Sequence, residues 1–171
     1  MAITNLNEHI CYKILSDDDY HHYIDVLSNS QVKFRHPNVL ALYKDDKSSK
    51  NFLVMERKGV PLHECSNYII NNAKTLIHSY LDDLHTDNKY HGDLVRDGGC
   101  GVNLGNVLYD EFEDFYYIID FNTKGSLQDE KHLRSVSEGY CPNVLIKSKK
   151  KNESSNLCSG EHSPSNRVLF L

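Results

Sequence analysis

Three polar residues whose types and order could support chemistry lie between positions 91 and 121. Asp93 follows a His-Gly pair, Asn106 opens an Asn-Val-Leu run, and Asp120 ends a run of aromatic and β-branched residues. Mg²⁺ prefers oxygen ligands and usually takes only one or two protein carboxylates together with phosphate oxygens. A further carboxylate can orient an attacking hydroxyl. The three residues therefore predict a site that holds a Mg²⁺-nucleotide beside an acceptor hydroxyl.

The composition is that of one globular domain. The 171 residues are 39% hydrophobic and 25% charged, and a chain of this size can bury a core. The net charge of −5 argues against a nucleic-acid partner, which usually requires a basic face. The five cysteines are widely spaced, which favours free thiols in a reducing compartment.

The sequence also bears on location. The N-terminus lacks the basic and apolar regions of a signal peptide. No apolar run approaches the roughly 18 residues of a membrane span. We therefore expect no membrane span and a place in the cytoplasm, either of the producing cell or of a host cell into which the protein is delivered.

The first part of the chain predicts elements that would position the polar residues. Residues 10–15 favour a mostly buried strand with Lys13 inside it. A helix is expected to begin after Ser16, because this residue can cap it and three acids follow in its first turn. The apolar spacing assigns the buried face of this helix to Tyr20, Tyr23, Ile24 and Leu27.

Two further strands and one long helix are expected before the site. A proline-fixed loop at 34–38 leads into a strand at 39–43, and another strand spans 51–56. Apolar residues at three- and four-residue steps predict a helix over 67–85. This helix feeds directly into the segment that carries Asp93.

The motifs ICYK, HPN, FLVME, HGDL, GNVL and IDF occur in this order, and together they resemble the protein-kinase-like superfamily. The resemblance covers about residues 10–143. It implies an α+β, two-lobed fold with a reduced N-lobe sheet that lacks a glycine-rich loop, and with a minimal, mostly helical C-lobe. The wording GNVLYD followed by IDF is also similar to some minimal kinase effectors secreted by enteric bacteria.

The expected organisation is a truncated kinase-like domain over residues 1–146, followed by a tail. The N-lobe remnant is assigned to about residues 1–56 and the C-lobe to about residues 59–146. Residues 147–171 are rich in Lys, Ser and Asn and show no apolar periodicity, so we predict a disordered, basic and Ser-rich tail.

The resemblance implies roles for the three polar residues. Asp93 would accept or orient the proton of the acceptor hydroxyl, while Asn106 and Asp120 would bind Mg²⁺. Asn106 lies thirteen positions after Asp93, whereas the family pattern gives five. The Gly-rich insertion could bulge outward and leave the two residues in register, or it could separate them. Asn103 is a less favoured substitute for Asn106.

The resemblance also implies a nucleotide site. Its residues would be Lys13 on the phosphates, Cys11 over the adenine ring, the backbone of Glu56 and Lys58 on the adenine edge, and Leu108 as the adenine floor.

Four departures from the family pattern stand out. The helix after Ser16 carries no Glu to pair with the strand lysine, and Asp25 is the nearest acid. Asn122 replaces the glycine after Asp-Phe, and asparagine can enter the left-handed region, which would preserve the turn. Gly92 replaces an arginine, and residues 137–143 resemble only faintly the end of an activation segment.

These observations favour an enzyme that transfers phosphate from ATP to protein Ser/Thr residues, with ATP and Mg²⁺ as cofactors and a protein as substrate or partner. A pseudokinase that acts as a binding or regulatory module is the alternative, because the phosphate loop and the helix Glu are missing. A small-molecule phosphotransferase is a second alternative. It rests on Gly92, since H-G-D is common in aminoglycoside and choline phosphotransferases.

Overall fold

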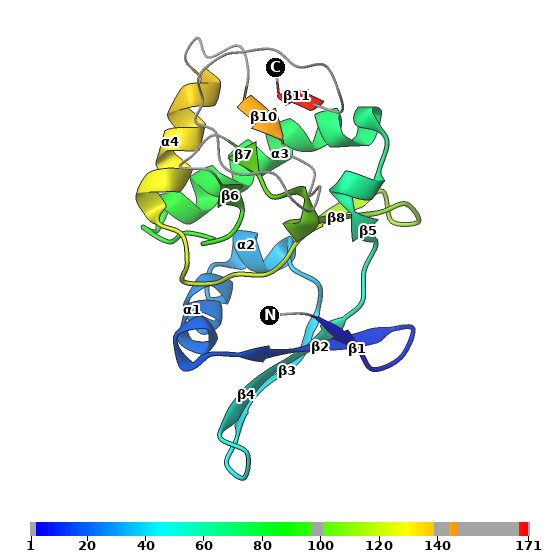
Figure 1. Ribbon diagram of the computed structural model, residues 1–171, viewed down its shortest axis with the longest axis vertical. Coiled ribbons are helices and arrows are strands. Elements are labelled where there is room, and N and C mark those ends of the chain that lie inside the picture. The colour runs from blue at the N-terminus through cyan, green and yellow to red at the C-terminus, as the bar shows by residue number, and fades with distance from the viewer. Residues whose placement is uncertain (1–2, 97–100, 139–143, 147–167, 171) are drawn as a thin grey trace, which may run out of the picture.

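A computed structural model of the chain describes residues 3–96, 101–138, 144–146 and 168–170 (Figure 1). The strands are β1 (Thr4–Asn5), β2 (Ile10–Leu15), β3 (Val39–Asp45), β4 (Lys50–Glu56), β5 (Val60–Pro61), β6 (Val95–Arg96), β7 (Gly101–Val102), β8 (Val107–Asp110), β9 (Phe115–Ile118), β10 (Val144–Ile146) and β11 (Val168–Phe170). The helices are α1 (Asp17–Leu27), α2 (Ser30–Phe34), α3 (Asn67–Thr86) and α4 (Leu127–Glu138), with 3-10 turns η1 (Leu62–Glu64) and η2 (Leu104–Asn106).

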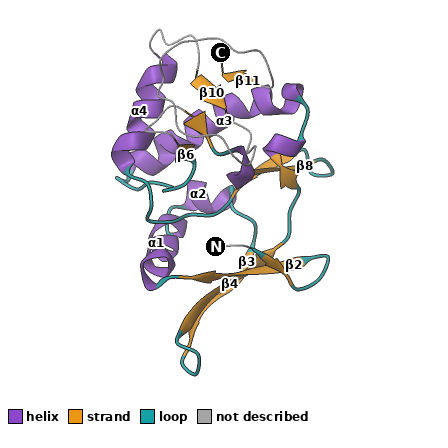
Figure 2. Cartoon of the chain, in the orientation of Figure 1, coloured by secondary structure: helices purple, strands orange, loops and turns teal. Residues whose placement is uncertain are grey.

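The N-terminal part is a four-stranded antiparallel sheet in the order β1-β2-β4-β3, which lies at one end of the molecule (Figure 2). Side chains alternate between buried and partly buried along β2, as expected for a strand with one face on a core. Lys13 falls on the buried face together with Cys11 and Leu15. The register pairs Lys13 with Leu53 and Cys11 with Met55. The sheet therefore carries one lysine into its own apolar face.

Helix α1 begins as predicted, since the Ser16 hydroxyl accepts a hydrogen bond from Asp19 N at 3.1 Å. Such a cap stabilises a helix by about 1 kcal/mol. The buried face is centred on Tyr23 and Val26, both fully buried. The prediction for Ile24 was wrong, because it is 46% exposed. Ile24 follows Tyr23 by one residue, and one residue turns a helix by about 100°, away from the sheet.

The C-terminal part is mostly helical and lies at the other end of the molecule, with α1 and α2 between it and the sheet (Figures 1 and 2). Helix α3 is 20 residues long and is capped by Ser66. Its buried residues are Ile70, Ala73, Ile77, Tyr80, Leu81 and Leu84, as the periodicity predicted. Strands β5, β8 and β9 form a three-stranded sheet, and α4 packs on α3. Among the described residues, no helix combines the length and the apolar composition that a membrane span requires.

Helix α4 takes up residues 127–138 of the segment after Asp120. Of residues 137–143, which faintly resemble the end of an activation segment, the first two lie in α4, and 139–143 lie outside the described part of the chain. Of the predicted disordered tail, 147–167 and 171 also lie outside it. The prediction did not anticipate strand β11, which pairs antiparallel with β10.

Candidate functional site

Asp93 and Asn106 are in direct contact. Asn106 Nδ2 donates hydrogen bonds to Asp93 Oδ2 and to the Asp93 carbonyl oxygen, both at 3.0 Å. Asn103 Nδ2 donates to the same two oxygens at 3.2 and 3.1 Å. Asn103 therefore acts alongside Asn106 and does not replace it. Because Asp93 engages the Asn106 amide nitrogen, the amide oxygen is the atom of this side chain that can coordinate a cation.

The insertion between these residues forms a hairpin at its described ends. Val95 pairs with Val102 and Arg96 with Gly101, so the chain leaves and returns at the same place. Asn103 N then donates to the Leu94 carbonyl at 2.7 Å. Of the two outcomes that the sequence left open, the structure shows the one in which Asp93 and Asn106 stay in register. Both valines at the base are buried, which anchors the hairpin in the core.

Lys13 forms an ion pair with Asp120, 107 positions further along the chain. Lys13 is only 3% exposed, and its Nζ lies 5.9 Å from the centre of the Tyr23 ring. A buried ammonium is costly unless a charge compensates it, and Asp120 supplies that charge. The strand lysine and the carboxylate after β9 thus meet at one point, as the kinase resemblance implies.

The turn at Asp120 is held on both sides by backbone hydrogen bonds. Ile119 N donates to the Asn106 carbonyl at 2.9 Å, and Asn122 N donates to the His91 carbonyl at 3.0 Å. Asp120 itself has a φ of +72°. The prediction that Asn122 takes the left-handed conformation was wrong, because Asp120 takes it instead. Aspartate is one of the few residues that tolerate this region.

Helix α1 contacts this turn through residues that the sequence did not single out. Tyr23 Oη accepts a hydrogen bond from Asp120 N at 3.1 Å. Asp19 Oδ1 accepts from Thr123 N at 3.0 Å and from the Thr123 hydroxyl at 3.2 Å. Asp25, which sequence reasoning named as the nearest acid to Lys13, pairs with Lys89 at 3.4 Å. Asp25 therefore does not form the ion pair with Lys13. Helical spacing alone could have found Tyr23, since it was predicted to lie on the buried face.

The electrostatics of the turn follow from these contacts. Burial opposes a low pKa at Asp19, but the N–H and hydroxyl of Thr123, the Ser16 hydroxyl and the Lys13 charge together lower the pKa of this carboxyl. Burial, and then the Asp120 charge, raise the pKa of Tyr23, so its hydroxyl stays protonated. At neutral pH the Asp19 carboxyl is therefore ionised and the Tyr23 phenol is neutral.

A column of packed rings supports the turn. Phe121 lies 4.9 Å from the Tyr23 ring and 5.0 Å from the His91 ring, measured between centroids. His36 adds a fourth ring, 5.3 Å from Phe121. Burial lowers the pKa of His36 to about 4 and also lowers that of His91, so both imidazoles are neutral at pH 7. Through Phe121 the column connects His91, two residues before Asp93, to Tyr23 of α1.

Glu130 of α4 is a second residue that the sequence did not single out. Its Oε1 accepts hydrogen bonds from His91 N at 2.8 Å and from Gly92 N at 2.9 Å. Its Oε2 lies 3.1 Å from His85 Nε2. The residue is only 2% exposed, so a buried carboxylate fixes the backbone immediately before Asp93. Ser126 and Asp129 form a capping pattern that could have revealed α4, but nothing local marks Glu130 as buried.

The backbone conformation and close packing at position 92 explain why a glycine is found there, without reference to the class of substrate. Its φ is +87°, and a Cβ built on it would lie 1.6 Å from the Asn122 carbonyl oxygen. The close approach of the two segments requires glycine at this position. The absence of an arginine here therefore follows from backbone packing.

The residues predicted to hold adenine come from β2, from the end of β4 and the chain after it, and from β8. Cys11 Sγ is 3.7 Å from the Met55 carbonyl and 4.0 Å from the Glu56 carbonyl, and burial raises the pKa of the Cys11 thiol. Glu56 N donates to the Asn38 carbonyl at 3.0 Å. Leu108 is buried in β8 and pairs with Pro61.

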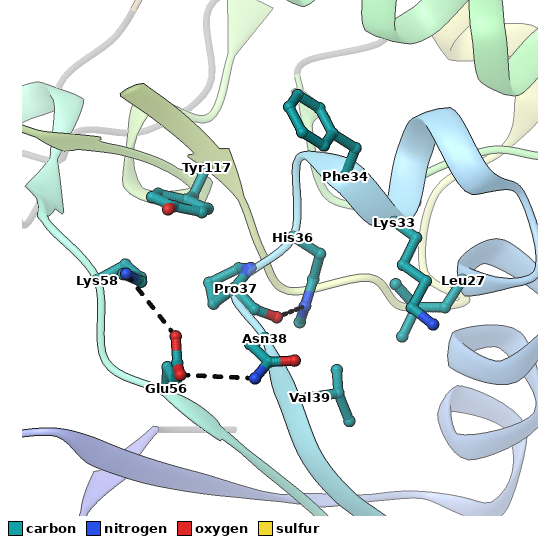
Figure 3. A pocket seen from close by; sticks show the side chains of 10 residues that line it. All are labelled: Leu27, Lys33, Phe34, His36, Pro37, Asn38, Val39, Glu56, Lys58 and Tyr117. Carbon is teal, nitrogen blue, oxygen red and sulfur yellow. Dashed lines mark hydrogen bonds and ion pairs between the residues drawn. The ribbon is translucent and has the colours of Figure 1, made fainter. Parts of the chain in front are cut away.

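Glu56 and Lys58 line a cavity of about 260 Å³ together with residues of α2 and of the connection from α2 to β3 (Figure 3). Lys58 Nζ contacts Glu113 at 2.6 Å and Glu56 at 3.7 Å. Asn38 Nδ2 donates to Glu56 Oε1 at 3.5 Å. The cavity does not include Lys13, Asp93, Asn106 or Asp120.

The element order, the sheet that carries a buried lysine, and the pairs Asp93–Asn106 and Lys13–Asp120 define a reduced, protein-kinase-like α+β fold, and the predicted fold class is confirmed. The structure is similar to the kinase PK-1 of Cydia pomonella granulovirus, with a TM-score of 0.47 and 17% identity over 66% of this chain and 41% of that one.

Two mutant forms of the Mycobacterium tuberculosis PknI kinase domain are also similar. Their TM-scores are 0.47 and 0.43, with 17% and 16% identity, over 66% of this chain and 49% and 48% of theirs. The chain thus spans less than half the length of each of these structures. No protein-family model and no curated protein matches the sequence.

Proposed function

We propose that this chain binds Mg-ATP and transfers its terminal phosphoryl group to Ser or Thr residues of a protein. The observation that carries the proposal is a set of two side-chain pairs from distant parts of the chain, which a backbone hydrogen bond links. Asn106 holds Asp93 at 3.0 Å, and Lys13 pairs with Asp120. The Asn106 carbonyl accepts from the residue before Asp120, which ties the two pairs together.

Each residue has a role in this proposal. Asp93 orients the acceptor hydroxyl, and its carboxylate is fixed by two amide groups. Asn106, through its amide oxygen, and Asp120 would hold Mg²⁺, which neutralises phosphate charge when bound. Lys13 would pass from Asp120 to the phosphate oxygens. All four side chains present the oxygen and ammonium groups that Mg²⁺ and phosphate require.

The remaining nucleotide contacts are proposed from the sequence resemblance. Cys11 would contact the adenine ring, Leu108 would lie beneath it, and the backbone of Glu56 and Lys58 would bind its edge. We keep the division into an N-lobe of about residues 1–56 and a C-lobe of about 59–146, the absence of a nucleic-acid partner and the cytoplasmic location as predictions.

Binding and transfer can be separated experimentally. Thermal unfolding with and without Mg-ATP should show stabilisation of about 2.7 kcal/mol at 100 times Kd. A labelled-ATP assay with generic protein acceptors should then show transfer that falls about 100-fold or more in Asp93→Asn. Lys13→Met and Asp120→Asn should weaken binding itself.

Matched surface substitutions serve as controls. Asp46→Asn lies in an exposed loop and Lys50→Met at the exposed start of β4, so both should behave like the wild type. Binding without transfer in the wild type would replace the proposal by the binding-module alternative. No Mg-ATP response, or equal transfer by wild type and Asp93→Asn, would overturn it.

The binding-module alternative has one specific observation in its favour. Lys13 is already paired with Asp120 and not with an acid from α1, so the ligand-free arrangement is closed by its own ion pair. The small-molecule alternative has lost its motivation, since backbone packing accounts for Gly92. A screen of sugars, choline and aminoglycosides for ATP consumption remains its test.

A further inference from the structure

Among the residues that the structure describes, Lys13 forms its ion pair with Asp120 and not with a carboxylate of helix α1. Asp19 of α1 lies close enough for its charge to interact with that of Lys13, but it does not form an ion pair with it. The face of α1 that meets the turn presents Tyr23, which is fully buried. A phenol in this place cannot balance the lysine charge, so it must contribute in another way.

Tyr23 makes two different contacts at the site. Its hydroxyl accepts the backbone N–H of Asp120 at 3.1 Å, and its ring lies beneath Lys13 Nζ at 5.9 Å. The first contact fixes the residue whose carboxylate faces Lys13. The second places the aromatic face within the range of a cation–π interaction. One side chain therefore contacts both members of the ion pair.

Asp120 needs such a contact because of its backbone. At φ +72° it occupies a region that few side chains adopt, and such a conformation persists only when its surroundings hold it. The neighbouring donors, Ile119 N and Asn122 N, are already bound to Asn106 and His91. Tyr23 supplies the acceptor for the N–H that lies between them.

A second side chain of α1 holds the residues that follow. Asp19, one turn before Tyr23, accepts two hydrogen bonds from Thr123. The helix therefore grips the turn at Asp120 and again three residues later. These contacts do not use Lys13 as the point of attachment.

We propose that Tyr23 is a positioning residue, through which helix α1 sets the orientation of Asp120 by its hydroxyl and not by a carboxylate–lysine pair. This role rests on the proposed function, in which Asp120 would hold Mg²⁺. Tyr23 touches neither nucleotide nor acceptor. It acts through the backbone of Asp120, so its loss should weaken Mg²⁺ binding more than it slows the transfer step.

Amide hydrogen exchange in the ligand-free protein tests the contact directly. Tyr23→Phe keeps the ring column and removes only the acceptor. The Asp120 amide should then exchange roughly tenfold faster or more, the equivalent of one lost hydrogen bond to a buried donor. Tyr20→Phe, one turn earlier on the same helix, should leave that rate unchanged. Unchanged protection of the Asp120 amide in Tyr23→Phe would overturn the proposal.

A Mg²⁺ titration at fixed ATP tests the consequence. The Mg²⁺ concentration for half-maximal stabilisation should rise roughly threefold to tenfold in Tyr23→Phe. This change corresponds to a loss of about 1 kcal/mol in the free energy of Mg²⁺ binding. The transfer rate at saturating Mg²⁺ should stay close to that of the wild type. A merely structural role would lower the melting temperature without moving this midpoint.

The two readouts separate the possible failures. A wild type without any Mg-ATP response overturns the proposed function and this role together. A wild type that responds, with a Tyr23→Phe variant equal to it in both readouts, overturns the role alone. If Tyr23→Phe does not fold, Asp19→Asn provides the second variant, with exposed Asp18→Asn as control. Faster exchange at Thr123 and a raised Mg²⁺ midpoint in Asp19→Asn support the grip of α1, and unchanged values contradict it.

Discussion

Removal of the Glu130 carboxylate should destabilise the protein strongly. Glu130→Ala leaves the N–H groups of His91 and Gly92 without an acceptor, and both residues are buried. An unsatisfied buried donor costs about 1–3 kcal/mol, so the two together amount to about 2–6 kcal/mol. A domain of this kind has about 5–15 kcal/mol of stability in total. The substitution should therefore consume a large fraction of it.

Glu130→Gln separates the acceptor from the charge. The amide keeps one oxygen for the two N–H groups, so we expect a smaller loss of about 1–2 kcal/mol. Urea unfolding followed by circular dichroism measures both variants at pH 7. Glu111→Gln, in an exposed loop, is the matched control and should change little.

A local change in the backbone is also expected in Glu130→Gln. Because Glu130 fixes the backbone that carries Asp93, the amide signals of His91 and Gly92 should shift in Glu130→Gln while α3 signals distant from His85 stay in place. A free energy of unfolding for Glu130→Ala within about 0.5 kcal/mol of the wild type would refute the argument, since that is the range of ordinary surface substitutions.

Three other outcomes are expected. Gly92→Ala should lower the free energy of unfolding by more than about 3 kcal/mol or prevent folding, since its Cβ would lie 1.6 Å from a carbonyl oxygen. Gly105→Ala, with a nearest contact of 3.4 Å, should have a small effect. Equal unfolding midpoints of the two variants would contradict this. Burial lowers the pKa of His36 to about 4. The unfolded chain, with a pKa of about 6.5 at this residue, therefore binds more protons between these values, and stability should fall by about 2 kcal/mol from pH 7 to pH 5. Urea curves at the two pH values check this, and equal stabilities would count against a buried neutral imidazole. Lys13→Met and Asp120→Asn should each destabilise the protein, and the double variant should lose at least about 1 kcal/mol less than the sum, whereas strict additivity would show that the pair contributes nothing.

Much of the fold could be predicted because its signals are local. The Ser16 cap, the alternation around Lys13 and the apolar steps of α3 depend on neighbours within one or two turns. Each was found where the sequence placed it. The prediction for Ile24 was wrong because apolar residues at four-residue steps define a helix face only approximately. The centre of the buried face depends on the elements that pack against the helix.

The site was only partly accessible from sequence. The order of Lys13, Asp93, Asn106 and Asp120 identified the residues, but their contacts are set by backbone pairing across distant segments. The pairing of β6 with β7 keeps Asp93 close to Asn106. The residue types in the insertion do not predict this pairing. The left-handed residue could not be chosen either, since both Asp120 and Asn122 tolerate that region.

The contributions of Tyr23 and Glu130 could not be predicted, for a related reason. Tyr23 was seen as an ordinary core tyrosine, and its hydroxyl acquires a partner only when β9 ends beneath it. Glu130 lies on a helix of low apolar content, where an acid is normally solvated. Tertiary packing alone turns it into an acceptor for the loop before Asp93.

The Lys13–Asp120 pair gives each of these two charges a partner without a ligand. A Mg-nucleotide that entered as proposed would bring a cation to Asp120 and anionic phosphate groups to Lys13, so each charge would exchange one partner for another. The Lys13 side chain is 4% exposed and that of Asp120 is 22% exposed, and salt screens partly buried charge pairs less than exposed ones. The affinity of the site should therefore depend on ionic strength less than that of a surface ion pair, and ligand entry should require Lys13 and Asp120 to separate.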